Sequence, residues 1–377
     1  MPWEERSTVS LRTEFIQQAQ EEGVNLSQLC CQFGISRKTA YKWLQRYRQE
    51  GEAGLQERSR RPHHSPRRSP PQTEAAVLAV REQHPAWGGR KIKAYLCQRG
   101  QAEAPPSAST ITEILRRHEH IDPQEASKHR AFQRFEMASP NQLWQMDFKG
   151  YFALTQGGYC HPLTVLDDHS RYLLGLRACA NQTYQTVQQQ LSILFEQYGL
   201  PDRMLMDNGS PWGDDADTPY TVLTAWLIRL GIQVCHARPY HPQTQGKEER
   251  LHRTLQEELL RYHRWDDLSQ CQWHFDRWRE VYNGERPHEA LQMQPPVRCY
   301  RRSARAFPEV LPAIEYESTD IVRRVDVSGK ISFRNRSFRV GKAFGHQPVA
   351  LRPTGRDGEY AVFFCWQRVA CISLRDV

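Results

Sequence analysis

The sequence predicts a multidomain α+β protein: two helix-turn-helix modules, an α/β domain on a mixed five-stranded sheet, and a small C-terminal β-barrel or sandwich. Three observations lead to this prediction. Helical periodicity dominates residues 1–120, strand and helix patterns alternate over 139–300, and short strands spaced about ten residues apart fill 301–377. The 377 residues allow two to four domains of ordinary size, about 100–200 residues each.

Charge and cysteine usage narrow the class of protein. Residues 1–138 carry a net charge of +6, 139–300 of −4 and 301–377 of +6. An acidic middle between basic ends fits a DNA-handling protein, although uneven surface charge on an ordinary multidomain protein explains it as well. The ten Cys contain no CxxC pair, and no apolar run is long enough for a membrane helix or a secretory signal. We expect an intracellular protein without structural zinc or membrane contact.

Residues 1–55 carry the first helix-turn-helix pattern. Asn25 and Ser36 precede two apolar-periodic segments and are suited to cap them, with a tight turn at Gly34 between the helices. Ala40 and Trp43 face inward on the last helix. Its outward face is predicted to touch DNA through Arg37, Lys38, Thr39, Tyr41 and Lys42. A generic three-helix bundle is the alternative.

Residues 56–72 read as a linker rich in Arg and Pro, which disfavours a packed element. Its arginines are candidates for tracking phosphates or entering a minor groove, and a solvated tether is an equal alternative. They are Arg58, Arg60, Arg61, Arg67 and Arg68.

Residues 73–120 repeat the helical theme and predict a second helix-turn-helix module, followed by a polar connector over 121–138. One helix follows Gly88-Gly89 and buries Ile92 and Leu96, and another begins near Ser107 and buries Ile111. The expected DNA contacts of this module are Arg90, Lys91, Ser109, Thr110, Thr112 and Arg116.

Residues 139–300 predict a mixed sheet covered by helices. Three antiparallel strands are followed by alternating helices and short strands. We expect strands at 143–148, 159–166, 172–176, 203–206 and 232–235, and helices at 181–199, 221–230, 243–262 and 265–282. In the tail, strands are expected at 325–327, 330–333, 337–340, 348–352, 360–365 and 369–372.

Three acidic residues carry the candidate chemistry. Asp147 lies in an apolar strand, Asp207 ends another strand before Asn208-Gly209, and Glu249 lies on the first turns of a helix. A carboxylate in such an apolar setting is unfavourable unless it is paired or binds a cation. If the first and fourth strands are neighbours and the helix crosses their ends, the three carboxylates converge. They would then hold two Mg²⁺ or Mn²⁺ ions about 4 Å apart for phosphodiester chemistry.

Five segments together resemble the transposases of integrase-type bacterial insertion sequences and, more distantly, retroviral integrases. They are WQMDFKG, VLDDHSRYLLG, DNGSPW, RPYHPQTQGKEERLHRTLQEEL and YNGERPHEAL. The resemblance covers about residues 139–292 and implies a ribonuclease-H-like core with an Asp-Asp-Glu site. It maps the catalytic and metal-binding acids onto Asp147, Asp207 and Glu249.

The resemblance also bears on the neighbours of these acids. The Gly-Lys-x-Glu-Arg pattern from Gly246 selects Glu249 over Glu248, which lies about 100° away around a helix. Forty-one residues separate Asp207 from Glu249, more than the family's usual thirty-five, and the excess is placed in the acidic segment 213–217. Lys247, Arg250 and Arg253 are expected to contact DNA.

The implied function is a DNA transposase acting in the bacterial cytoplasm and associated with the nucleoid when bound to DNA. It would bind the terminal inverted repeats of a mobile element and catalyse 3′-end cleavage and strand transfer into target DNA, as at least a homodimer. The alternative is a domesticated or decayed transposase that regulates by binding DNA without catalysis. A ribonuclease-H-type nuclease is a weaker rival, because two upstream helix-turn-helix modules do not suit it.

Overall fold

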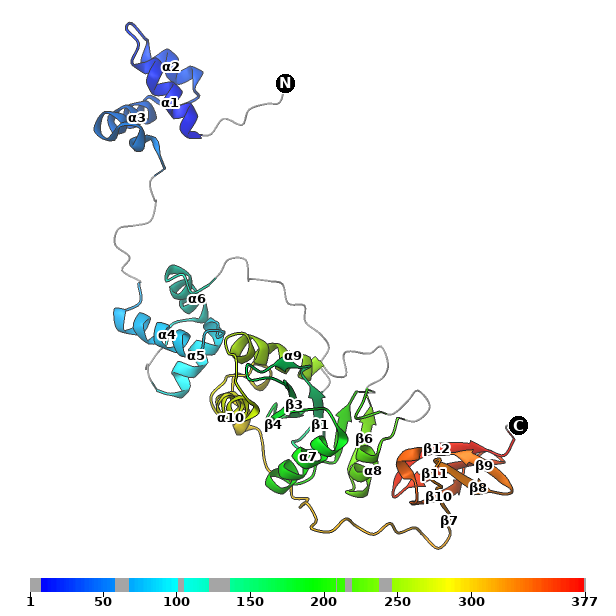
Figure 1. Cartoon of the computed structure of the whole chain (residues 1–377). Helices are drawn as coiled ribbons and strands as arrows, with labels where there is room; N and C mark the ends of the chain where they lie inside the picture. Colours follow the sequence, from blue (N-terminus) through cyan, green and yellow to red (C-terminus); the bar gives the residue numbers. More distant parts are fainter. Residues whose placement is uncertain are drawn as a thin grey trace. The chain divides into compact units, whose positions relative to one another are not determined.

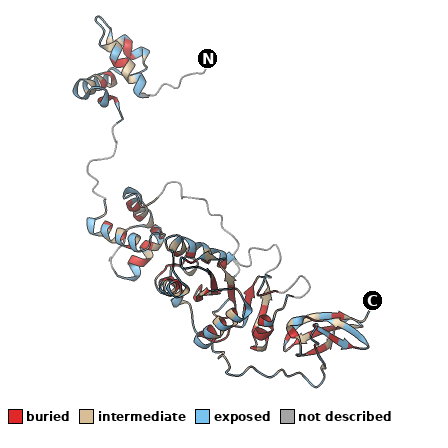
Figure 2. Cartoon of the chain, viewed as in Figure 1, coloured by how far each residue is buried: buried red, intermediate tan, exposed pale blue. Residues whose placement is uncertain are grey.

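The computed structural model describes residues 8–57, 68–100, 105–121, 136–207, 209–213, 219–236 and 246–375. The chain divides into two compact units, Met1–Arg68 and Ser69–Val377 (Figure 1). Each unit contains its own buried residues, coloured red in Figure 2. No helix among the described ranges combines the length and apolar character needed to cross a membrane.

The first unit is a three-helix module of α1 (Thr8–Ala19), α2 (Leu26–Gln32) and α3 (Arg37–Glu50), closed by a short 3-10 turn, Gly51–Leu55. Asn25 Oδ1 accepts from the backbone of Ser27, and Ser36 Oγ accepts from Thr39 N at 3.2 Å. These bonds satisfy amides that a helix start leaves unpaired. The predicted helix-turn-helix arrangement is confirmed.

The second unit begins with another three-helix module, α4 (Pro71–Gln83), α5 (Gly89–Gln98) and α6 (Ala108–Arg117). Ser107 Oγ caps α6 by accepting from Thr110 N at 3.1 Å. At Gly89 the helices α5 and α6 approach so closely that a Cβ would lie 2.3 Å from Ala108 O. Glycine is therefore required where these two helices meet.

The central domain is a mixed sheet with the predicted strand adjacency. Its main order is β4-β3-β1-β5-β6, and a short β2 also pairs with β3. The strands are β1 (Trp144–Phe148), β2 (Phe152–Ala153), β3 (Tyr159–Asp167), β4 (Leu173–Cys179), β5 (Arg203–Met206) and β6 (Gln233–His236). β1 is antiparallel to β3 and parallel to β5, which brings the carboxyl ends of β1 and β5 to the same edge.

Helices cover both faces of this sheet. On one face α7 (Tyr184–Tyr198) and α8 (Val222–Arg229) pack on Trp144 and Val165. On the other face α9 (Gly246–Leu255) and α10 (Leu268–Gly284) pack on Leu166 and Leu176. The long helix expected to Tyr262 instead leaves α-geometry in a π-helical turn, Gln256–Leu260. Two short 3-10 turns, Glu289–Leu291 and Pro296–Arg298, follow α10.

The tail forms two small sheets. It does not form a closed barrel, which was one of the two forms expected from the sequence. One is antiparallel in the order β12-β11-β10-β7, and the other is the hairpin β8–β9. The elements are β7 (Ile321–Arg324), β8 (Lys330–Phe333), β9 (Arg336–Arg339), a 3-10 turn (Lys342–Phe344), β10 (Pro348–Pro353), β11 (Glu359–Phe364) and β12 (Gln367–Ser373).

The first strand of the tail was predicted wrongly at 325–327. Asp326 Oδ1 accepts hydrogen bonds from the amides of Ser328 and Lys330, at 2.8 and 2.9 Å. These bonds hold residues 326–330 in a turn. The strand therefore ends at Arg324, before the predicted range.

Candidate active site

Asp147 lies near the end of β1, partly buried. Its Oδ1 accepts from Phe148 N at 2.8 Å, and its main-chain oxygen accepts from Thr164 Oγ1 at 2.9 Å. Thr164 is the residue opposite Asp147 in the β1–β3 register. Burial, and then the nearby Asp207, raise the pKa of Asp147 to about 6. The two aspartates therefore repel each other at the edge formed by β1 and β5. Two acids that bind one cation are expected to repel in this way when the cation is absent.

Asp207 directly follows β5, where the chain turns. Its Oδ1 accepts from Gly209 N at 3.0 Å, and its main-chain oxygen lies 3.1 Å from His236 Nδ1 on β6. A Cβ at residue 209 would come within 3.3 Å of Asp207 Oδ2. Glycine thus leaves room for this carboxylate, while Asn208 lies outside the described residues.

The first turn of α9 presents its two adjacent acids differently from the prediction. Glu248 is 1% exposed and interacts electrostatically with Asp147, whereas Glu249 is exposed. The expected convergence of Glu249 with both aspartates is not present in this geometry. Adjacent helix positions point about 100° apart, so the packing that buries residue 248 turns residue 249 outward.

Glu248 belongs to a buried polar group that the sequence did not reveal. Its Oε2 lies 3.0 Å from Thr164 Oγ1 and 3.6 Å from His252 Nε2. Its Oε1 is buried without a hydrogen-bond partner among the described residues. Burial, and then Asp147, raise the pKa of Glu248 well above its ordinary value. The one available signal was the i, i+4 spacing of Glu248 and His252.

His252 completes this group. Its Nε2 lies 2.9 Å from Thr164 Oγ1, and its Nδ1 lies 3.9 Å from Asp147 Oδ2. Burial lowers the pKa of His252 to about 4, so the ring is neutral at neutral pH. A neutral ring supplies no counter-charge for Asp147.

The donors at this edge fit a hard divalent cation. Carboxylate oxygens are the ligands that Mg²⁺ prefers, and Asp207 lies close enough to Asp147 to raise its pKa. Among the described residues, however, no three His, Cys, Asp or Glu side chains enclose a single metal position. The two aspartates are therefore not joined by a third such side chain in the part of the chain that the structure describes.

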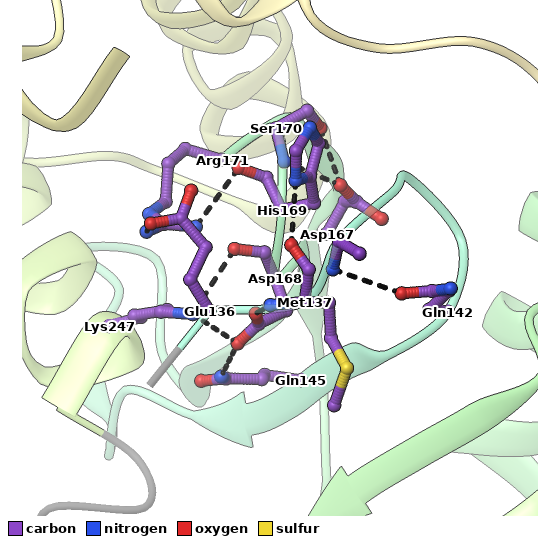
Figure 3. Close-up of polar contacts among 11 residues, drawn as sticks. Glu136, Met137, Gln142, Gln145, Asp167, Asp168, His169, Ser170, Arg171 and Lys247 are labelled. Atoms are coloured by element: carbon purple, nitrogen blue, oxygen red, sulfur yellow. Dashed lines mark hydrogen bonds and ion pairs between the residues drawn. The ribbon is translucent and has the colours of Figure 1, made fainter. Parts of the chain in front are cut away.

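Lys247, predicted to contact DNA, is instead largely buried. Its side chain is 16% exposed, and its ammonium group forms an ion pair with Asp168, whose side chain is fully buried (Figure 3). Arg250 and Arg253, on the same helix, are exposed. Arg250 lies 3.9 Å from Glu289. The prediction for Lys247 is corrected because the first turn of α9 directs this side chain into the protein.

The predicted DNA-contacting face of α3 is exposed. Arg37, Lys38, Tyr41 and Lys42 reach solvent, and Thr39 is half-buried. The linker residues Arg58, Arg60, Arg61 and Arg67 lie outside the described residues, and Arg68 is exposed.

In the second module, the residues predicted to contact DNA differ in their exposure to solvent. Ser109 and Arg116 of α6 are exposed, whereas Thr110 and Thr112 are half-buried. Thr112 Oγ1 donates to Ala108 O at 2.8 Å. Arg90 is exposed although it pairs with a residue of the core domain, whereas Lys91 is half-buried. Arg90 forms an ion pair with Glu289, and burial with Arg286 nearby lowers the pKa of Lys91 to about 8.

Comparison with known protein families gives matches along most of the chain. Integrase core domain models match residues 138–242 and 230–296, and an IS481 family transposase C-terminal domain matches 320–377. A helix-turn-helix domain matches residues 11–63, and a homeodomain-like domain matches 39–115.

Two curated relatives come from bacterial insertion elements. The uncharacterized 39.2 kDa protein of IS476 from Xanthomonas euvesicatoria is 27% identical over 159 residues, 42% of this chain and 44% of that protein. The uncharacterized 31.7 kDa protein of IS407 from Burkholderia multivorans is 25% identical over 158 residues, 42% of this chain and 54% of that protein. The chain thus spans about half the length of these relatives.

Solved structures of integrases align with this chain at low sequence identity and low TM-score. A chain of the simian T-cell lymphotropic virus intasome with PP2A regulatory subunit B56 gamma is 14% identical, with a TM-score of 0.38 over 80% of this chain and 96% of that one. The catalytic core domain of BIV integrase is 21% identical, with a TM-score of 0.31 over 42% and 93%. The sheet topology described above remains the evidence for the fold.

The domain matches and the mixed sheet define a protein with an integrase core and helix-turn-helix domains. More particularly, the IS481-type C-terminal domain and the insertion-element relatives support an integrase-type insertion-sequence transposase.

Proposed function

We propose that this chain is a DNA transposase that binds the terminal inverted repeats of a mobile element and catalyses divalent-metal-dependent 3′-end cleavage and strand transfer. The observation that carries the proposal is that Asp147 and Asp207 lie at one edge of an integrase core, where burial and then Asp207 raise the pKa of Asp147, beside the acidic first turn of α9. Phosphoryl transfer by bound divalent cations requires such convergent acids.

Asp147, Asp207 and Glu249 are the residues that would hold the Mg²⁺ or Mn²⁺ ions, two per site. The choice of Glu249 over Glu248 rests on access and on the Gly-Lys-x-Glu-Arg context. Glu248 is 1% exposed beneath Thr164 and His252, where a DNA phosphate cannot reach it. Glu249 starts from the same helical turn, is exposed, and has three side-chain torsions with which to swing toward Asp147.

The reaction needs no covalent bond to the protein. Water attacks the phosphodiester at each element end, the 3′-oxygen leaves with a proton, and the new 3′-OH attacks a target phosphodiester in the same way. When bound, the cations activate the attacking oxygen and stabilise the leaving oxygen. The chain fixes the backbone positions of Asp147, Asp207 and Glu249 through β1, β5 and α9, and orients the strand with exposed cations such as Arg253.

DNA binding is assigned to both helix-turn-helix modules. The exposed N-terminal face of α3 and the exposed residues of α6 would read base edges, while Lys and Arg hold phosphates. Two element ends must meet one target, so the active form is at least a homodimer.

Incubation with DNA duplexes taken from both sides of the coding sequence tests the proposal. The wild-type chain should protect the element end from footprinting reagents and, with Mg²⁺, nick it at one 3′ position. Asp147→Asn and Asp207→Asn should retain protection and lose nicking. Protection by the wild type without nicking would instead support the catalytically inactive DNA-binding regulator.

A further inference from the structure

Beside the candidate site lies a buried ion pair with no part in the chemistry proposed above. Lys247, the second residue of α9, places its Nζ against the carboxylate of Asp168 and 3.2 Å from the main-chain oxygen of the same residue. The Lys247 side chain is 16% exposed and that of Asp168 is fully buried. Neither group is positioned to meet a DNA backbone.

Asp168 is fixed from several sides. It lies in the turn between β3 and β4, and its Oδ1 accepts from Gln145 Nε2 at 2.7 Å. Its Oδ2 accepts from Met137 N at 2.9 Å (Figure 3). The preceding Asp167 holds the same turn, because its Oδ1 accepts from Ser170 N at 2.8 Å and from Ser170 Oγ at 2.6 Å. The carboxylate that receives Lys247 is therefore a rigid anchor.

This anchor connects α9 to the strand that carries Asp147. Gln145 lies on β1, two residues before Asp147, and Lys247 directly precedes Glu248 and Glu249. Successive helix residues are about 100° apart, so fixing the direction of residue 247 also fixes the directions of residues 248 and 249. The pair thus holds α9 in the rotation that buries Glu248 beside Asp147 and leaves Glu249 exposed.

We propose that Lys247 and Asp168 are positioning residues that fix the rotation of the first turn of α9 and hence the placement of its acids against Asp147. The inference rests on the proposed function for its catalytic consequence, but its structural part stands apart from catalysis. A buried ion pair that loses one partner leaves an uncompensated charge, so either single change should release the turn.

The variants Lys247→Ala, Asp168→Asn and the conservative Lys247→Arg test the proposal in the full chain. Each of the first two changes should lower kcat for end cleavage about ten- to a hundredfold, because Glu249 must reach the aspartates from a fixed backbone position and small misplacements of reacting groups have effects of that order. Affinity for the end duplex should stay within about twofold, with an unchanged salt dependence. Lys247→Arg keeps a cation against Asp168 and should retain more of the wild-type kcat than Lys247→Ala.

Arg253→Ala is the matched comparison, since it removes a positive charge from an exposed position on the same helix. It should weaken DNA binding and lower the slope of log K against log salt by about 1, as a lost phosphate contact does. If Lys247→Ala behaves like Arg253→Ala while Asp168→Asn cleaves normally, Lys247 is a DNA contact and the proposal is overturned.

Hydrogen exchange provides a readout that does not depend on catalysis. In Lys247→Ala and Asp168→Asn the amides of residues 250–253, which bond to the carbonyls of the first turn of α9, should exchange faster than in the wild type, with α10 unchanged. Unchanged protection of these amides would overturn the positioning role, whether or not the wild type cleaves DNA. Faster exchange in a chain that never cleaves would leave the positioning role standing and reject the proposed function.

Discussion

Glu248 Oε2 lies 3.0 Å from Thr164 Oγ1, whose hydroxyl also lies 2.9 Å from the main-chain oxygen of Asp147. Thr164 Oγ1 is directed as a donor toward both Glu248 Oε2 and Asp147 O, so its single proton is shared between two acceptors. Glu248 Oε1 has no hydrogen-bond partner among the described residues. Burial and Asp147 raise the pKa of Glu248 although the Thr164 bond lowers it.

The free energy of unfolding should depend on pH through the protonation of Glu248. Its folded pKa is raised above the ordinary 4.5, so above that pH the unfolded chain releases a proton that the folded chain keeps. The wild type therefore loses stability relative to Glu248→Gln as pH rises, by about 1.4 kcal/mol per pH unit until the folded pKa is reached. Thermal unfolding from pH 4 to 8, followed by tryptophan fluorescence, measures this. A constant difference between the two proteins would refute a protonated Glu248.

Metal binding should depend on pH through Asp147. Its pKa of about 6 in the metal-free chain means that a cation displaces a proton below that pH. We expect Mg²⁺ affinity, measured by calorimetry, to rise between pH 5 and 7 and to level off above. Asp147→Asn should bind weakly at every pH. A wild-type Mg²⁺ affinity that does not change with pH would show that Asp147 is not a metal ligand. Removing the metal with a chelator should abolish end cleavage and leave end binding intact.

The contact between α5 and α6 predicts a stability effect at Gly89. A Cβ there would lie 2.3 Å from Ala108 O and 2.6 Å from Thr112 Oγ1, so Gly89→Ala should destabilise the second module by about 1–3 kcal/mol. Gly88→Ala is the control, because nothing lies within 4 Å of its Cβ position. Hydrogen exchange of α4–α6 compares the two, and equal effects would argue against the close approach.

DNA binding by the first module should depend on the N-terminal face of α3. Lys38→Ala should weaken binding to the end duplex and lower the slope of log K against log salt by about 1. Arg48→Ala removes the same charge at the other end of the exposed surface of α3 and should have a smaller effect. Titrations at several salt concentrations measure both slopes. Equal losses would indicate general charge attraction in place of a defined contact.

Local features of the fold were predictable because their causes are local. Asn25 and Ser36 accept hydrogen bonds from amides two or three residues ahead, so their capping roles are visible in the sequence. The adjacency of β1 and β5 was only a condition for the convergence of the acids, because strand patterns do not give pairing, and the structure meets it. The earlier position of β7 was missed because the turn depends on which amides Asp326 captures.

The candidate site was predictable only in part. Asp147 and Asp207 sit at strand ends that the apolar pattern marks, and the structure brings them together. Periodicity gives the angle between Glu248 and Glu249 but not the absolute rotation of the helix. That rotation depends on partners far away in sequence, such as Asp168 for Lys247 and Thr164 for Glu248.

Comparison of Glu248→Gln with Glu249→Gln in one end-cleavage assay, with Asp147→Asn as the inactive reference, tests the central claim most directly. Both changes remove one carboxylate from adjacent residues while keeping side-chain size. We expect Glu249→Gln to be as inactive as Asp147→Asn, whereas Glu248→Gln should keep substantial cleavage at neutral pH. Cleavage by Glu249→Gln at the wild-type rate, together with its loss in Glu248→Gln, would contradict the assignment and make the buried acid the third ligand.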